Sequence, residues 1–384
     1  MVSLYDHALP ARYFLQFFPC RPLGSPKADG MMSPMDCRLR MQEMIARSAA
    51  LVPDLPALVA ALDGKRILAS GATGFFGLWL HAAASYLRDL GCDVRLTRLS
   101  RSPQGFETRH PEWAALPWAS WVVAEAGGFA EVEAGAFDLG LHMATSSDAA
   151  SNHADPGRLI ADMLSGMSGM LDLCEAAGAR LLMVSSGAVY GKRVSGDRPF
   201  AEDDTARLAP DPLDPMLFYG EIKRMCESMC ATRGQSVEFA VARPFSFLGP
   251  FLPLGTHFAA GNFLADAAQR RVITIRGDGT PLRSYMHPAD MICWLLWSLV
   301  FTPAGSALNI GSPQAVSLAE LASLMAHESG APPPAILGQP GGRGDSYLPD
   351  VTRAHAAGLR AAFSLEDIVR DSLTWLAASG SADW

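Results

Sequence analysis

The 384-residue sequence lacks the features that mark several classes of protein. Its seven cysteines are scattered and form no CxxC pair, so we expect reduced thiols in a cytoplasmic protein and no metal site. The longest apolar run, MICWLLWSLVF at 291–301, is too short to span a bilayer and predicts a buried helix. That run leads us to expect no membrane partner. The net charge of −8 leaves no basic surplus, which argues against nucleic acid as the main partner.

Residues 1–64 lack the regular pattern that follows them. Two stretches, 41–52 and 55–62, have helical spacing of apolar residues, so we predict a partly helical N-terminal extension. The apolar FLQFFP segment is too short for a secretory signal. Two explanations stay open for this region: an overlong start, or an extension that packs on the core.

From residue 65 onward, strand-like and helix-like stretches alternate. This alternation predicts a Rossmann-type doubly wound parallel sheet of the α/β class, covered by helices on both faces, over residues 65–245. The expected strands are 66–70, 93–99, 120–124, 139–144, 180–186 and 237–243, with helices at 75–90, 157–178 and 216–233.

After residue 245 the alternation loosens into Pro- and Gly-rich loops between helices. We predict that residues 246–384 form a smaller C-terminal α/β substrate lobe, partly interleaved with the first domain. Such a lobe would cover the carboxyl edge of the sheet, where open α/β sheets bind ligands. The expected helices are 259–270, 288–301, 317–328 and 365–378.

A glycine turn follows the first expected strand. Gly71 allows the tight turn, Gly74 allows backbone to approach a pyrophosphate, and Gly77 allows the helix to pack closely on the strand. The phosphates would lie on the first amides of the helix, where the helix dipole favours an anion. A plain structural turn is the alternative. The residues of the predicted cofactor site in this turn are Gly71, Thr73, Gly74, Phe75, Phe76 and Gly77.

The end of the second expected strand bears on the choice between NAD and NADP. An acid there would bind both ribose hydroxyls and favour NAD, but LTRLSRS (96–102) contains none. Ser100 and Arg101 occupy this place, and an arginine can bind the 2′-phosphate of NADP. A solvated Arg101 is the other interpretation, and the sequence leaves both open.

Two further motifs have the residues of an acid–base site. The stretch VSSGAVYG (184–191) ends a strand on serines, and Tyr219 and Lys223 follow one helical turn apart, on one helix face. A lysine cation next to a tyrosine favours the phenolate, which makes the tyrosine a usable general base. The Ser186 hydroxyl can orient a substrate alcohol or carbonyl.

Taken in order along residues 65–378, these motifs resemble the extended short-chain dehydrogenase/reductases, in particular the NAD-dependent epimerase/dehydratase group that modifies nucleotide sugars. The other matching segments are HxA at 142–144, RPFSFLGP (243–250) and RSYMHPAD (283–290). The resemblance implies a homodimer and a nucleotide-sugar substrate. It implies a catalytic triad of Ser186, Tyr219 and Lys223, with Tyr219 and Lys223 also binding cofactor. It adds His142, Ala144 and Pro244 to the cofactor site, and places Ser186, Gly187, Asn262 and Arg283 against substrate.

The chain departs from this group at two positions. Gly187 and Ala188 stand where the dehydratases typically carry acids, and neither can move a proton, which disfavours 4,6-dehydration unless another acid such as Glu221 takes part. Ser246 also replaces the asparagine usual in its segment.

The resemblance leaves several functions open. We expect an epimerase with tightly bound NAD that works through a 4-keto intermediate, with Tyr219 as general acid and base. The alternative is an NADPH-dependent reductase of an NDP-4-keto-6-deoxyhexose, which Arg101 favours. A 4,6-dehydratase is a weaker alternative. A non-catalytic cofactor-binding protein fits least, because binding alone needs no intact triad.

Overall fold

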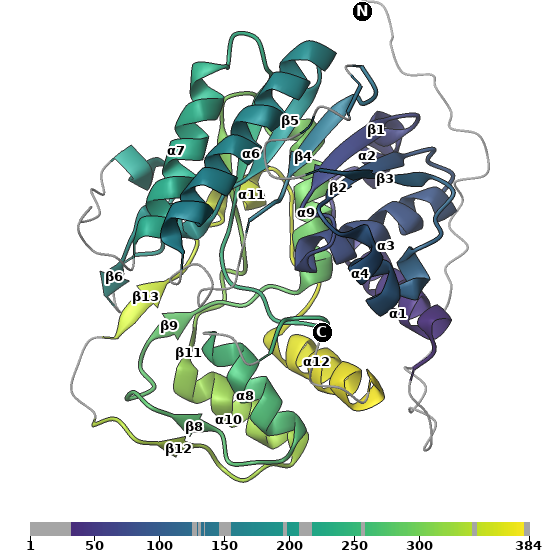
Figure 1. Cartoon of the computed structure of the whole chain (residues 1–384). Coiled ribbons are helices and arrows are strands. Elements are labelled where there is room, and N and C mark those ends of the chain that lie inside the picture. Colours follow the sequence, from purple (N-terminus) through teal and green to yellow (C-terminus); the bar gives the residue numbers. More distant parts are fainter. Residues whose placement is uncertain are drawn as a thin grey trace, which may run out of the picture.

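A parallel sheet of seven strands forms the centre of the protein, in the order β10-β7-β5-β4-β1-β2-β3 (Figure 1). The computed structural model describes residues 32–124, 129, 132–133, 135–145, 155–194, 198–206, 217–254, 258–339 and 344–379. The strands of this sheet are β1 (Arg66–Ser70), β2 (Arg95–Ser100), β3 (Ala119–Val123), β4 (Leu139–His142), β5 (Arg180–Val184), β7 (Phe239–Pro244) and β10 (Ala307–Ile310). The predicted doubly wound sheet is confirmed.

Burial on both faces explains why these short apolar runs become strands. Successive side chains of a strand point to opposite faces. In β1, Ile67 and Ala69 join the hydrophobic cluster on one face of the sheet, and Leu68 joins the cluster on the other. In β5, Leu182 and Met183 divide between the two clusters in the same way. A strand buried on both sides reads as a continuous apolar run.

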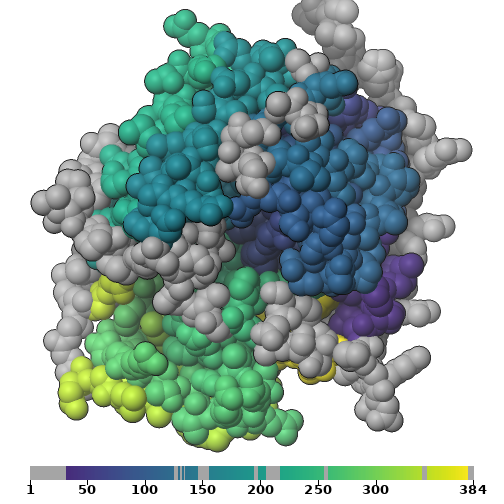
Figure 2. All heavy atoms as spheres, in the orientation of Figure 1, coloured from purple at the N-terminus to yellow at the C-terminus, as the bar shows by residue number. Residues whose placement is uncertain are grey.

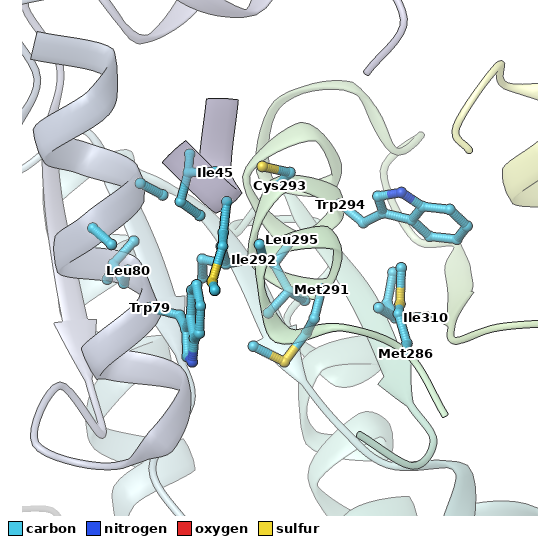
Figure 3. Close-up of a cluster of buried hydrophobic side chains, with 14 of the residues drawn as sticks. Ile45, Trp79, Leu80, Met286, Met291, Ile292, Cys293, Trp294, Leu295 and Ile310 are labelled. Carbon is cyan, nitrogen blue, oxygen red and sulfur yellow. The ribbon is translucent and has the colours of Figure 1, made fainter. Parts of the chain in front are cut away.

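Two groups of helices cover the sheet (Figure 1). One face carries α1 (Pro34–Ala49), α3 (Phe75–Asp89) and α9 (Pro288–Phe301), with α2 (Leu55–Leu62) against α9. The other face carries α6 (Pro156–Ala177) and α7 (Phe218–Thr232). In Figure 3, Ile292 of α9 lies beside Trp79 of α3 and near Ile45 of α1. The apolar run at 291–301 is thus in a buried helix, and no helix among the described residues has the length and apolarity needed to cross a membrane.

The described part of the N-terminal region packs on this core. Helix α1 begins at the cap residue Ser33 and lies against α3 and α9. At its far end the Ser48 hydroxyl donates to the buried carboxylate of Asp290 at 2.7 Å. Asp290 also accepts from the backbone amides of Ala362 and Phe363, at 3.0 and 3.3 Å. One carboxylate therefore joins α1, α9 and the segment before the last helix.

The C-terminal part forms a lobe that lies below the sheet in Figures 1 and 2. Its helices α8, α10 and α12 pack on one another. Its strands form a four-stranded sheet in the order β11-β9-β13-β6 and a β12-β8 pair. The bounds are β6 (Arg193–Val194), α8 (Ala259–Ala268), β8 (Thr274–Ile275), β9 (Leu282–Arg283), β11 (Val316–Ser317), α10 (Leu318–Ser329), β12 (Ala335–Ile336), β13 (Asp345–Tyr347) and α12 (Leu365–Ser379).

The lobe and the sheet exchange segments. Strand β6 comes from the chain between β5 and β7 of the central sheet yet pairs with β13 of the lobe. Conversely, α9 and β10 come from beyond residue 245 and pack on or pair with the central sheet. The remaining short helices are α4 (Pro103–Arg109), η2 (Pro111–Trp113), η3 (Gly187–Tyr190), η4 (Glu202–Ala206) and α11 (Thr352–Ala356). The domain limits at residues 64 and 245, the homodimer and the cytoplasmic location stay predictions.

We predict that the Asp290 junction makes stability depend on pH. Burial raises the pKa of Asp290 to about 6, above its value in an unfolded chain. Such a carboxyl group stabilises the fold most when it is protonated, and this contribution is lost as the pH rises through the folded-state pKa. Between pH 4 and pH 7 the wild type should therefore lose on the order of 2 kcal/mol of unfolding free energy relative to Asp290→Asn. Urea titrations of both proteins measure this, and a difference that does not change with pH would refute it.

Candidate functional site

The candidate site lies at the carboxyl edge of the sheet, where the strand order reverses. From β1 the chain proceeds to β2 and β3 on one side, while β4, β5, β7 and β10 follow on the other. Adjacent strands whose connections lead in opposite directions leave a crevice beyond their carboxyl ends, and ligands of open α/β sheets bind there. β1 and β4 are the two strands at this point.

The glycine turn after β1 has the geometry that an anion needs. Gly71 has φ 71°, and a Cβ there would lie 2.8 Å from the amide nitrogen of Ala144. A Cβ on Gly77 would lie 2.3 Å from the backbone of Ala72, so α3 can pack this closely only with glycine. Gly74 is exposed, and it caps α3 without any side-chain hydrogen bond. The first amides of α3 are thus left for a phosphate, and these residues fit a dinucleotide.

The aromatic residues of this turn connect it to the chain beyond β7. Thr73, Phe75 and Phe76 are half-buried. The Phe76 ring packs edge-to-face on Phe247, with 5.4 Å between ring centroids. The start of α3 is therefore held in place by the segment that follows β7. The last residue of β7, Pro244, is buried.

Hydrogen bonds join the ends of β1 and β4. The Ser70 hydroxyl lies 2.9 Å from Nδ1 of His142 and accepts from the Ala144 amide at 3.2 Å. Burial, together with the nearby charge of Lys223, lowers the pKa of His142 to about 3, so its imidazole is neutral. His142 therefore acts as a neutral connector at the floor of the predicted cofactor site.

The two arginines of LTRLSRS occupy different environments. Arg101 is exposed just after β2, and Ser100 accepts a hydrogen bond from the Ser102 amide. Arg98 is buried, donates to the Trp113 carbonyl at 3.1 Å, and stacks on the Trp121 ring at 3.9 Å. Arg98 therefore anchors the segment around η2, and of these two arginines only Arg101 is exposed.

Helix α7 brings Tyr219 and Lys223 to the end of β5. The Lys223 ammonium is buried, donates to the Val184 carbonyl at 2.9 Å, and lies 6.0 Å from the centroid of the Tyr219 ring. Gly220 allows this approach, because a Cβ there would lie 2.4 Å from the Ala188 carbonyl oxygen. The start of α7 thus packs directly on the turn that carries Ser186.

Ser185 and Ser186 lie just beyond β5, which ends two residues earlier than the sequence predicted. Ser186 caps η3: its hydroxyl accepts from the Ala188 amide at 3.1 Å. Ser185 is buried and donates to the Glu227 carboxylate at 2.6 Å. The chain therefore leaves the strand at these residues. Of the two serines, Ser186 is the one whose side chain interacts with Tyr347 of β13.

Gly187 is closed off by two aromatic side chains that sequence analysis did not identify. A Cβ on Gly187 would lie 2.6 Å from the Tyr347 hydroxyl oxygen and 2.9 Å from the Phe245 ring. The Tyr347 hydroxyl also interacts with Ser186 and lies near Tyr219. Burial raises the pKa of Tyr347, which therefore keeps its proton at neutral pH. No local pattern points to Tyr347, because it comes from β13 of the lobe.

Of the two predicted substrate residues that lie in the lobe, one reaches this cluster. Arg283 of β9 is the cross-strand partner of Tyr347, and its guanidinium donates to Asp345 at 2.7 Å. Asn262 is exposed near the start of α8, on a separate element of the lobe. Within the described ranges, no three His, Cys, Asp or Glu side chains are grouped so as to hold a metal ion.

The chain is similar to known proteins in sequence and in fold. UDP-glucuronic acid decarboxylase 1 of Xenopus tropicalis is 29% identical over 186 residues, which are 48% of this chain and 43% of that protein. The UDP-glucose 4-epimerase of Thermotoga maritima, solved with UDP-glucose, has a TM-score of 0.68 at 19% identity, covering 82% of this chain and 100% of that one. The UDP-glucuronic acid 4-epimerase of Bacillus cereus, solved with NAD and a fluorinated substrate analogue, has a TM-score of 0.66 at 20% identity, covering 81% and 99%.

The match to a family model assigns the chain to a family, which the similarities to individual proteins do not do. The chain spans less than half the length of the decarboxylase, and the solved structures are similar in fold at low identity. The profile of the NAD dependent epimerase/dehydratase family matches residues 67–311. This range runs from β1 to the end of β10 and contains the glycine turn, Ser186, Tyr219 and Lys223. The chain belongs to the NAD dependent epimerase/dehydratase family.

Proposed function

We propose that the protein epimerises a nucleotide sugar at C4 and keeps its NAD throughout the cycle. The observation that carries this proposal is the arrangement at the end of β5, where Tyr219 and Lys223 of α7 pack against the turn of Ser186, on the same sheet edge as the glycine turn. When bound, NAD supplies the oxidation of the sugar carbon and its later reduction.

Three side chains would handle the proton and the oxygen at C4. Tyr219 takes the proton of the sugar hydroxyl and later returns it to the keto oxygen. The buried ammonium of Lys223, 6.0 Å from the ring, favours the phenolate form that this step needs. Ser186 has its hydroxyl oxygen bound by the Ala188 amide, so its own proton can be donated to the oxygen at C4.

The closed space at Gly187 supports epimerisation over 4,6-dehydration. Elimination of water needs an acid and a base close to the sugar ring. The Tyr347 hydroxyl and the Phe245 ring fill the place where a side chain at 187 would lie. The nearby Glu221 is 3.9 Å from Arg224, with which it forms an ion pair on the same helix. The described geometry therefore favours reactions in which no base has to remove the C5 proton.

Decarboxylation of a nucleotide-linked uronic acid is the second candidate, favoured by the sequence similarity to UDP-glucuronic acid decarboxylase 1. A 4-keto uronic acid is a β-keto acid: its C5–C6 bond breaks, CO₂ leaves, and the enolate that forms takes up a proton at C5 before the keto group is reduced. It needs no base beside Ser186 to remove a carbon-bound proton, so the closed space at Gly187 is compatible with this reaction too. UDP-glucose and UDP-glucuronic acid, named by the similar proteins, are the first substrates to test.

Retention of the cofactor distinguishes internal redox chemistry from a reductase. We expect mass spectrometry of the freshly purified and denatured protein to find NAD or NADH at about one per chain. Neither epimerisation nor decarboxylation consumes the cofactor, so it need not leave. An empty site, or NADP that exchanges freely, would contradict the proposal and favour the NADPH-dependent 4-ketoreductase.

Loss of the Tyr219 hydroxyl should abolish turnover but not binding. We expect Tyr219→Phe to lower kcat by about a hundredfold or more, since a positioned acid–base group contributes at least that much. NMR in D₂O would follow the reaction of each UDP-sugar. The hydrogen at C4 of the product should come from the substrate and not from solvent.

Tyr86→Phe is the matched control, because it removes a phenol from the opposite side of the sheet, on α3. Bound nucleotide should be unchanged in both variants. A fully active Tyr219→Phe protein would exclude Tyr219 as the acid–base group.

Arg101 tests the preference for NAD over NADP. If its exposed guanidinium at the end of β2 binds a 2′-phosphate, Arg101→Ala should weaken NADP binding about tenfold or more and leave NAD binding nearly unchanged. Calorimetric titration of the nucleotide-free protein measures both affinities. Arg95→Ala is the control, because Arg95 begins the same strand at the opposite edge and pairs with Asp93. Equal losses of NAD and NADP affinity would mean that Arg101 does not bind the 2′-phosphate.

A further inference from the structure

The reaction proposed above uses Ser186, which leaves the buried serine beside it without a role. Ser185 is 4% exposed, and its amide donates to the Ala242 carbonyl of β7 at 2.7 Å. Its hydroxyl donates to Oε1 of Glu227 at 2.6 Å. Ser185 is therefore held at the backbone by the neighbouring strand and at the side chain by α7.

Glu227 lies on the face of α7 that carries the proposed catalytic residues. Tyr219, Lys223 and Glu227 follow one another at intervals of four residues, so they are stacked along one side of the helix. Lys223 donates to the Val184 carbonyl, and Glu227 accepts from the Ser185 hydroxyl. Two consecutive residues at the end of β5 are thus attached to two consecutive turns of the helix.

Arg243 of β7 fixes the orientation of the Glu227 carboxylate. Its guanidinium donates to both carboxylate oxygens, at 3.0 and 2.7 Å, and the two side chains are 7% and 15% exposed. The same guanidinium donates to the Tyr190 hydroxyl and to the Glu202 carbonyl, both at 2.9 Å. A carboxylate bound at both oxygens by a planar, forked donor has little freedom to rotate.

This arrangement determines where the Ser186 hydroxyl lies. Ser186 has an extended backbone, with φ −161° and ψ 150°. Consecutive residues of an extended chain point to opposite sides. A Ser185 side chain held toward α7 by Glu227 therefore keeps the Ser186 side chain on the other side, toward Tyr347.

We propose that Glu227, acting through Ser185, is a positioning residue that holds Ser186 and Lys223 in the relative position that the reaction needs. This inference rests on the proposed function for its kinetic consequence. A buried ion pair such as Arg243–Glu227 gives little net stability compared with apolar residues of the same size, so its value here lies in the geometry that it fixes.

Ser185→Ala is the sharpest test, because it removes the hydroxyl while Glu227 keeps both hydrogen bonds from Arg243. We expect kcat to fall about tenfold with KM nearly unchanged, since small displacements of catalytic groups affect the chemical step most. Ser185→Thr retains a hydroxyl and should recover most of the loss. Glu227→Gln keeps an acceptor for Ser185 and should lie between the two.

A second readout needs no turnover. Hydrogen exchange of the Ala188 amide reports how firmly the Ser186 hydroxyl is held, because that hydroxyl accepts a hydrogen bond from this amide. Ser185→Ala should speed this exchange, because a less ordered β5 end holds Ser186 less firmly. If no nucleotide sugar reacts, the proposed function fails while this exchange rate still decides the positioning role.

Ser85→Ala is the matched control, because Ser85 is also buried and its hydroxyl accepts hydrogen bonds from Arg38 and Gln42 of α1, away from the site. This variant should lose stability without a change in kcat or in the exchange of the Ala188 amide. Unchanged kcat and an unchanged exchange rate in Ser185→Ala would overturn the proposal. So would equal effects of Ser185→Ala and Ser85→Ala, since both would then report stability alone.

Discussion

The contact between helix α7 and the end of strand β5 is the constraint on which the rest of the site depends. Gly220 lets the helix approach until its backbone meets the Ala188 carbonyl, and Lys223 then reaches the Val184 carbonyl. A larger residue at 220 would push the helix outward and move the phenol and the ammonium away from Ser186 together. The spacing of Tyr219 and Lys223 has chemical meaning only because this approach exists.

A second constraint comes from the lobe. Tyr347 and Phe245 occupy the space beside Gly187, so the small residue after Ser186 is needed for packing and at the same time excludes an acid from that place. Burial keeps Tyr347 protonated, and the neutral His142 adds no charge on the other side. Under the proposed function, the proton chemistry would thereby be left to Tyr219, with Lys223 as the cation beside it. This distribution of charge would suit a reaction confined to one carbon and its oxygen.

Sequence analysis could predict the central sheet because burial on both faces produces continuous apolar runs, and it could predict the glycine turn because backbone geometry restricts Gly71 and Gly77. It missed β10 and the small sheet of the lobe, whose strands of two to four residues are too short to show a period. It missed Tyr347 and Glu227 because their roles depend on partners far away in the chain. The buried Arg98 of β2 and the exposed Arg101 just after it likewise cannot be told apart from the sequence.

The buried polar network connects the position of the lobe to the geometry of the site. From Glu227 it passes through Arg243 to the Tyr190 hydroxyl, which donates to Asn309 of β10 at 2.7 Å. The side-chain amide of Asn309 in turn donates to the backbone carbonyl of Asp350 at 3.0 Å. Asp350 lies five residues after the start of β13. Arg243, Tyr190 and Asn309 are buried, so displacing one of them leaves its partner without a hydrogen bond, which costs more than the bond itself contributes. The strand that supplies Tyr347 is therefore tied to the helix that supplies Tyr219. Under the proposed function, a displacement of the lobe would strain this network and with it change the alignment of Ser186 and Tyr219.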